Sequence, residues 1–181
     1  MQNVYMTPNP VASRPLRGKA VTLRLAREAD IPDLHSVLQA PEVARWWGDS
    51  SQEQLLADLQ GGDFHTLVIE VEGRTAGILL YSEELDPEYR HAGMDIALAP
   101  EYHGRGLGQD ALRTMARYLF EELGHHRLTI DPAAANEHAI ETYRRVGFRP
   151  VGVMRQYELG ADGSWHDGLL MDLLRGEFVP S

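Results

Sequence analysis

The alternation of apolar and polar residues along the chain predicts a mixture of strands and helices. Val21, Leu23 and Leu25 alternate with polar neighbours over residues 20–27, which is typical of a half-buried strand. Apolar runs at 64–72, 74–82, 93–99, 127–131, 148–159 and 165–174 predict six further strands. Apolar residues at helical spacing predict helices at 31–38, 41–47, 52–59, 107–123 and 136–146.

The order of these elements predicts an α/β (α+β) fold, a mixed sheet with helices on both faces. A helix separates the strands at 93–99 and 127–131, so the crossover rule predicts that these two strands are parallel. Glu72 and Gly73 form a tight hairpin signal between two other strands. We expect residues 1–18 to form an extended arm and residues 19–178 to form one domain, without an internal repeat.

The segment between the strand at 93–99 and the helix at 107–123 is rich in glycine. It reads His103-Gly104-Arg105-Gly106-Leu107-Gly108. Glycine lets the backbone approach a ligand, and the first-turn N–H groups of a helix have no intrahelical acceptor. Together with the positive end of the helix dipole, these features predict a pyrophosphate site. A tight strand-to-helix turn without a ligand is the alternative.

Two other phosphate-binding motifs are excluded at this loop. A Walker loop needs Lys and then Ser or Thr after its last glycine, and Gln109 follows Gly108 here. The dinucleotide fingerprint needs a third glycine at a spacing that this segment does not supply.

Composition narrows the choice of partners. The net charge of −10 disfavours nucleic acid and favours a cationic ligand, although solubility alone also accounts for an acidic chain. No apolar run approaches the ~20 residues of a membrane span, and residues 1–15 lack the apolar core of a signal peptide. Cysteine is absent, which excludes a disulfide framework and a cysteine nucleophile and is consistent with a cytoplasmic protein.

Two tryptophans stand next to each other in the helix at 41–47. Adjacent helical residues point ~100° apart, so at least one of Trp46 and Trp47 should line a groove or the surface. The neighbouring pairs His125-His126 and His166-Asp167 do not have a metal-ligand spacing, and we predict no metal site.

The glycine loop resembles the acyl-CoA pyrophosphate loop of the GNAT N-acetyltransferases. A second stretch is similar to another signature of that family at its usual spacing: Asn136, Ala139, Ile140, Tyr143, Gly147 and Phe148. The resemblance covers about residues 20–175, and His103 stands where the family commonly has Gln or Arg. Within the family the chain looks most like the aminoglycoside 6′-N-acetyltransferases. Its C-terminal hairpin resembles that of the ribosomal-protein N-terminal acetyltransferases, and the siderophore-type lysine acyltransferases are also similar.

This resemblance implies a mostly antiparallel sheet whose central parallel pair splays to hold acetyl-CoA, the donor co-substrate. The backbone of Ile96 and Leu98 would pair with the pantetheine, and a backbone N–H at this edge would stabilise the oxyanion. The implied donor-binding residues are Ile96, Ala97, Leu98, His103, Gly104, Arg105, Gly106, Leu107, Gly108, Gln109, Asn136, Ala139 and Tyr143.

Two residues have implied catalytic roles. Tyr143 takes the place of the general acid toward the CoA thiolate. Because a phenol has a pKa near ~10 and a thiol one near ~8.5, full proton transfer to the thiolate is uphill. Tyr143 would therefore act as a hydrogen-bond donor unless its pKa is lowered. The alternative for Tyr143 is a core tyrosine. Asp95 takes the place of a carboxylate base. At a pKa of ~3.9 it is a poor base without desolvation or a water relay, so anchoring the ammonium is equally open.

The resemblance also implies an acceptor site, made by Trp46, Trp47, Asp86, Asp95 and Asp131 around a small cationic amine. Loop capping and turn formation are the alternatives for the carboxylates of Asp86 and Asp131. The expected reaction is direct acetyl transfer to a primary amine, first of all an aminoglycoside 6′-amine. Protein N-terminal acetylation, lysine acylation in siderophore synthesis and a non-catalytic acyl-CoA-binding module are the alternatives. We expect a monomer or a homodimer.

Overall fold

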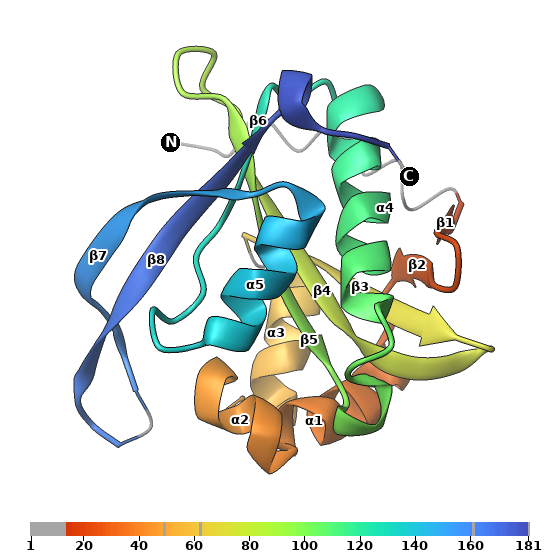
Figure 1. Ribbon diagram of the computed structural model, residues 1–181. Coiled ribbons are helices and arrows are strands. Elements are labelled where there is room, and N and C mark those ends of the chain that lie inside the picture. The colour runs from red at the N-terminus through yellow and green to blue at the C-terminus, as the bar shows by residue number, and fades with distance from the viewer. Residues whose placement is uncertain (1–13, 49, 62, 161, 181) are drawn as a thin grey trace.

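The protein folds into one twisted sheet with helices on both faces (Figure 1). The structure is a computed structural model that describes residues 14–48, 50–61, 63–160 and 162–180. Within these residues the strands are β1 (Leu16–Arg17), β2 (Thr22–Leu25), β3 (His65–Val71), β4 (Arg74–Glu84), β5 (His91–Leu98), β6 (Arg127–Ile130), β7 (Arg149–Leu159) and β8 (Trp165–Leu174). The α-helices are α1 (Ile31–Gln39), α2 (Pro41–Trp47), α3 (Gln52–Gly61), α4 (Leu107–Glu121) and α5 (Glu137–Val146). The predicted fold class is confirmed.

The strand order is β1-β2-β3-β4-β5-β6-β8-β7. All neighbouring pairs are antiparallel except β5 and β6, which are parallel as the crossover rule predicts. Glu72 and Gly73 have φ values of 52° and 74° and form the two-residue turn between β3 and β4. Positive φ at both positions matches the twist of a β-hairpin, which confirms the hairpin signal.

The two edges of β5 are paired to very different extents. β4 pairs with β5 along its whole length, from Glu84↔His91 to Gly77↔Leu98. β6 pairs with β5 only at Ala92↔Leu128 and Gly93↔Thr129. Beyond Gly93 the parallel strands separate, as the family resemblance implied, and the second half of β5 has an open edge.

Backbone alternation shows which groups of β5 face this opening. The N–H of Ala99 donates to the carbonyl of Ala76 at 2.9 Å, which makes that pair a hydrogen-bonded one. Hydrogen-bonded pairs alternate along an antiparallel ladder, so Ala97 and Asp95 also bond to β4. The backbone groups of Ile96 and Leu98 therefore point toward the opening.

Each face of the sheet has its own apolar core. Helices α4 and α5 pack on one face, where Met115 and Leu119 meet residues such as Leu79. Helices α1 to α3 cover the other face, where Leu34 meets Val68 and Ile78. Because side chains alternate along a strand, β5 presents Asp95 and Ala97 to the α1–α3 side and Ile96 and Leu98 to the α4–α5 side.

The predicted N-terminal arm is described only at its end, because residues 1–13 lie outside the described residues. Leu16 and Arg17 form β1, and Leu16 is buried opposite Leu23 of β2. The carboxylate of Asp110 in α4 accepts the backbone N–H groups of residues 19–21 and holds the following turn. The sheet thus begins before the domain boundary predicted at residue 19.

Candidate functional site

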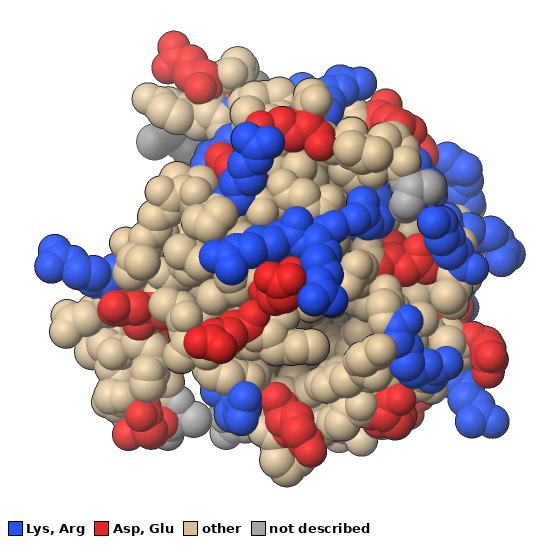
Figure 2. All heavy atoms as spheres, viewed as in Figure 1, with Lys and Arg blue, Asp and Glu red and all other residues tan. Residues whose placement is uncertain are grey.

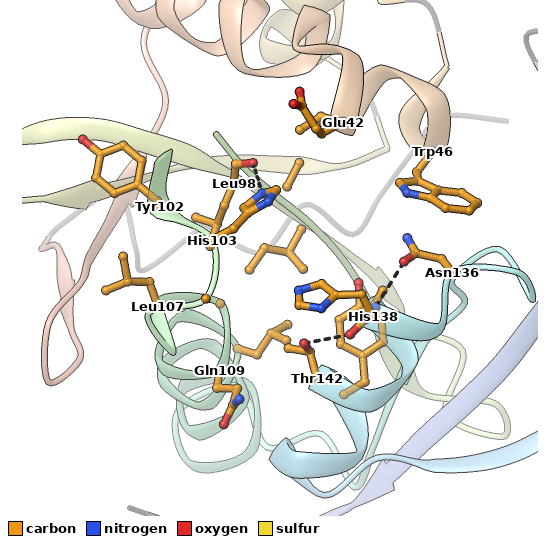
Figure 3. A pocket seen from close by; sticks show the side chains of 18 of the residues that line it. Glu42, Trp46, Leu98, Tyr102, His103, Leu107, Gln109, Asn136, His138 and Thr142 are labelled. Atoms are coloured by element: carbon orange, nitrogen blue, oxygen red, sulfur yellow. Dashed lines mark hydrogen bonds between the residues drawn. The ribbon is translucent and has the colours of Figure 1, made fainter. Parts of the chain in front are cut away.

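A cavity of about 700 Å³ lies beside the open edge of β5. It is lined by α2, the second half of β5, the glycine loop, the N-terminal turns of α4, and α5 along most of its length (Figure 3). The predicted donor-binding residues that line it are Ile96, Ala97, Leu98, His103, Gly104, Gly106, Leu107, Gly108, Gln109, Asn136, Ala139 and Tyr143. Segments more than 40 residues apart in the sequence therefore meet at one cavity.

The glycine loop presents its amides to this cavity. Gly104 and Gly106 have φ values of 70° and 74°, and a Cβ atom at either position would meet no neighbouring atom within 4 Å. These positions need glycine for backbone conformation rather than for space. Among the described residues, no protein group accepts a hydrogen bond from the N–H groups of residues 104–109. Successive unpaired amides at a helix N-terminus form an anion-binding nest that fits a diphosphate.

His103 occupies one backbone acceptor at the cavity wall. Its Nε2 lies 2.7 Å from the carbonyl oxygen of Leu98 (Figure 3). A carbonyl only accepts, so Nε2 carries the hydrogen. The N–H of Leu98 and both backbone groups of Ile96 still face the opening. Ala97 differs from these residues, because its backbone belongs to the β4 ladder.

Helix α5 carries Tyr143 into the floor of the opening. The Asn136 side chain accepts the N–H of Ala139 at 3.2 Å and caps the helix, which sets the position of Tyr143 two turns later. Tyr143 is buried, with its ring 6.4 Å from that of Phe148. Burial and the carboxylates of Asp95 and Asp131 raise the pKa of Tyr143 above its ordinary value. Its hydroxyl therefore stays protonated at neutral pH and can donate a hydrogen bond.

Asp95 and Asp131 face each other where the strands separate. Each lies two residues beyond the last parallel pair, Gly93↔Thr129, and so on the same face of the sheet. Asp95 is largely buried, and within the described residues no donor or cation pairs with its carboxylate. Burial, followed by the charges of Asp131 and Glu158, raises the pKa of Asp95 to about 7. A carboxyl group with this pKa suits a general base at neutral pH.

Both tryptophans of α2 line the cavity on the side opposite the glycine loop. Trp46 and Trp47 are half-buried, and Trp47 also packs against the core beneath α1 to α3. The guanidinium carbon of Arg45 lies 4.5 Å from the centroid of the Trp46 ring. One face of Trp46 is thus already covered by a cation.

Four predicted site residues do not line the cavity: Asp95 and Asp131, which lie where the strands separate, and Asp86 and Arg105. Asp86 stands in the turn between β4 and β5, where its Oδ1 accepts the N–H of Glu88 and its own N–H donates to Glu84. This turn is at the opposite end of β5 from the cavity, so the structure does not bring Asp86 to the other acidic residues. Arg105 belongs to the glycine loop, but its guanidinium lies 5.6 Å from the Tyr102 ring, outside the cavity lining.

Sequence reasoning missed several cavity-lining residues. His138, Thr142 and Arg145 of α5 line the cavity at i, i+4 and i+7 spacing, beside the apolar stripe that contains Tyr143. That polar stripe was the available signal, because residues at this spacing share a helix face.

Figure 2 shows that Lys and Arg side chains gather in the middle of the face formed by α4 and α5. Acidic side chains adjoin these cations in the same view, so this face carries both signs of charge.

The described residues contain no group of three or more His, Cys, Asp or Glu side chains that could hold a metal ion. In the same part of the chain, none of the helices combines the length and apolar character needed to cross a bilayer.

Comparison with known proteins assigns the chain to a family. The family model for the acetyltransferase (GNAT) domain matches residues 20–149. The chain is 28% identical to spermidine N(1)-acetyltransferase of Escherichia coli (strain K12), over 88% of this chain and 89% of that protein. It is also 28% identical to aminoglycoside N(6′)-acetyltransferase type 1 of Klebsiella pneumoniae, over 75% and 77% of the two chains.

A solved structure agrees with this assignment. Mycobacterium smegmatis RimJ in complex with CoA-disulfide superposes with a TM-score of 0.77 at 25% identity, covering 93% of this chain and 88% of that one. The chain belongs to the GNAT acetyltransferase family and is an acetyl-CoA-dependent N-acetyltransferase.

Proposed function

We propose that this enzyme transfers acetyl directly from acetyl-CoA to a primary amine of a small cationic substrate, with an aminoglycoside 6′-amine as the first candidate. Donor binding is supported by the amides from Gly104 to Gln109 at the N-terminus of α4, which have no acceptor among the described residues. Acceptor binding is supported by the Asp95 carboxylate at the same opening, which no donor or cation of the described chain pairs with.

The donor would lie along the open edge of β5. The diphosphate would accept hydrogen bonds from the loop amides, and the pantetheine would pair with the outward backbone groups of Ile96 and Leu98. Extended chains bind an open strand edge through such main-chain hydrogen bonds. This placement would bring the thioester between Asp95 on one side of the sheet and Tyr143 on the other.

The chemistry follows from these two positions. The Asp95 carboxylate takes one proton from the acceptor ammonium, and the freed amine forms a C–N bond with the thioester carbonyl carbon as the C–S bond breaks. The nitrogen loses its second proton as the amide forms, and that proton neutralises the departing CoA thiolate. The Tyr143 hydroxyl donates a hydrogen bond to the departing thiolate. Its raised pKa keeps the hydroxyl protonated, so this hydrogen bond remains available. Holding the amine against the thioester supplies the rest of the rate increase through proximity.

The charge of the acceptor site favours cationic acceptors. Asp95 and Asp131 lie where β5 and β6 separate, without a cation from the described residues, and Trp46 and Trp47 offer ring surfaces in the cavity that Ile96, the residue after Asp95, also lines. Aminoglycosides and polyamines both carry several ammonium groups, and relatives named for each class show the same degree of identity to this chain. A protein N-terminus carries a single ammonium group, so it supplies only one cation for the two carboxylates.

Two assays would test this proposal. Binding of acetyl-CoA should raise the melting temperature of the protein, because a ligand that binds only the folded state stabilises it. Release of free CoA thiol should then be measured with kanamycin, spermidine, lysine and an alanine-initiated peptide as separate acceptors. Turnover with kanamycin supports the first candidate, and turnover with spermidine alone moves the proposal to polyamines. Turnover only with the peptide would reject a small cationic acceptor, and binding without turnover would indicate a non-catalytic acyl-CoA-binding module.

A further inference from the structure

The β7–β8 hairpin contains an irregularity that lies next to the acceptor site. Met154 pairs with Gly168 and Glu158 pairs with His166, so β7 has two more residues than β8 over this interval. Within the bulge Gln156 has a φ of 49°, a conformation that side-chain-bearing residues rarely adopt. Its N–H donates to Oδ1 of Asp167 at 2.8 Å. The bulge is thus held in place, and such features often re-aim side chains near active sites.

The bulge directs Tyr157 across β8 toward Asp131. A Cβ atom at Gly168 would lie only 2.8 Å from Cδ1 of Tyr157, so the tyrosine ring packs on the bare backbone of that glycine. Gly168 also forms a bridge with Ala133, which ties the segment after β6 to the same place. The Tyr157 hydroxyl donates a hydrogen bond to Asp131, which raises the pKa of Tyr157 to about 12.

Glu158 follows and adds a third carboxylate to this region. Its charge acts on Asp95 together with that of Asp131. The ion pairs within the described residues involve other carboxylates, so no Lys or Arg of that part of the chain neutralises these three groups. Like charges held together cost stability unless a cation joins them. The hairpin tip projects on the side of the molecule where α2 lies (Figure 1).

We infer that Glu158, with Asp131 held by Tyr157, forms a second ammonium subsite beside the reacting amine. The enzyme then selects acceptors with at least two protonated amines, and it acetylates the one at Asp95 while the other rests against Glu158. Glu158 is a specificity-determining residue, and Tyr157 is a positioning residue that acts through Asp131. This inference rests on the proposed function and extends it from one cationic amine to a polyamine.

The test compares acceptors that differ in their number of ammonium groups. One matched pair is kanamycin and 6-amino-6-deoxyglucose, and the other is spermidine and 1-aminobutane. For the pair whose polyamine is turned over, kcat/KM is measured for both members with the wild-type enzyme and with Glu158→Gln, Tyr157→Phe and Glu88→Gln. Glu88 lies in the turn between β4 and β5, away from the cavity, so its variant removes the same charge without touching the subsite.

The expected result is a selective loss. Glu158→Gln should raise KM for the polyamine about tenfold and Tyr157→Phe about threefold, the range for single hydrogen bonds to charged and neutral groups. KM for acetyl-CoA, kcat/KM for the monoamine, and all constants of Glu88→Gln should stay at wild-type values. Both tested side chains are partly exposed, and their variants differ from the native residues by few atoms, so folding should persist, as a melting curve would verify.

Two results would overturn the subsite. They are equal kcat/KM of the wild type for both members of a pair, and equal losses for both members in Glu158→Gln. Absence of thiol release with every small amine, whether or not the peptide is turned over, is a separate outcome, because it would reject the proposed function itself. The two failures are therefore distinguishable in one set of assays.

Discussion

In the function proposed above, the two sides of the opening between β5 and β6 bind opposite charges by different means. The donor side consists of the amides of residues 104–109 with Tyr143, and its positive character comes from backbone dipoles. The proposed acceptor side consists of Asp95, Asp131 and Glu158, and its negative character comes from side chains. A backbone site depends on conformation, whereas a side-chain site depends on residue identity. Substitutions should therefore affect the two sides in different ways.

The largest effect is expected on the acceptor side, from Asp95→Asn. The amide is nearly isosteric but cannot take a proton, so kcat should fall at least about 100-fold, the usual contribution of a general base. KM for acetyl-CoA should not change, because the loop amides do not contact Asp95. Thiol-release kinetics at pH 7.5 would measure both constants.

Asp86→Asn is the matched control for that variant. It makes the same substitution in the turn at the far end of β5, and it should keep wild-type turnover. A loss in Asp95→Asn of less than threefold would leave Asp95 only the role of an ammonium anchor.

The next effect is expected on the donor side, from Gly106→Val. A β-branched residue strongly disfavours a φ of 74°, so the loop should change conformation and its amides should lose their common direction. The affinity for acetyl-CoA should fall at least about tenfold, since several hydrogen bonds to a charged group are lost together. Isothermal titration calorimetry would measure the dissociation constant.

Gly73→Val separates backbone strain from ligand binding. Gly73 has the same φ of 74° and the same open surroundings, but it lies in the β3–β4 turn. It should destabilise the protein without changing acetyl-CoA affinity. Equal losses of affinity in both variants would mean that strain alone, rather than the amide nest, accounts for the effect.

A smaller effect is expected from Tyr143→Phe. Loss of the hydroxyl removes one hydrogen bond to the developing thiolate, so kcat should fall about tenfold. KM for both substrates should stay near wild type, because the interaction forms only in the transition state. An unchanged kcat would make Tyr143 a core residue that packs against Phe148.

The last expected effect is on the free energy of unfolding rather than on turnover or affinity, and it concerns the acceptor side alone. The pKa of Asp95 is raised in the folded state to about 7, so the unfolded state gains more from ionisation as pH rises. Asp95→Asn should match the wild type below pH ~4, become more stable relative to it between pH ~4 and 7, and keep that advantage above pH 7, by roughly 1–3 kcal/mol. Urea unfolding at pH 4, 6 and 8 would measure it. A constant difference across this range would show that Asp95 has an ordinary pKa.

The donor side was largely predictable from the sequence, and the acceptor side was predictable only in part. Alternating glycines before an amphipathic helix predict an amide nest from local geometry, and the loop has that geometry. Asp86 and Asp131 looked equivalent in the sequence, yet one lies in a distant turn and the other faces Asp95. The difference depends on which end of β5 each residue meets, and this is a property of strand register.

The pattern of apolar residues determined the strands, the helices and the parallel β5–β6 pair, because these depend on side-chain period and on the handedness of crossovers. The glycine positions likewise determined the loop that opens α4. Only the tertiary structure decided where β5 and β6 separate, that the bulge in β7 brings Tyr157 to Asp131 and the charge of Glu158 near Asp95, and that Asp95 has no partner among the described residues. Those features arise from contacts between segments far apart in the chain, and no local pattern of residues records them.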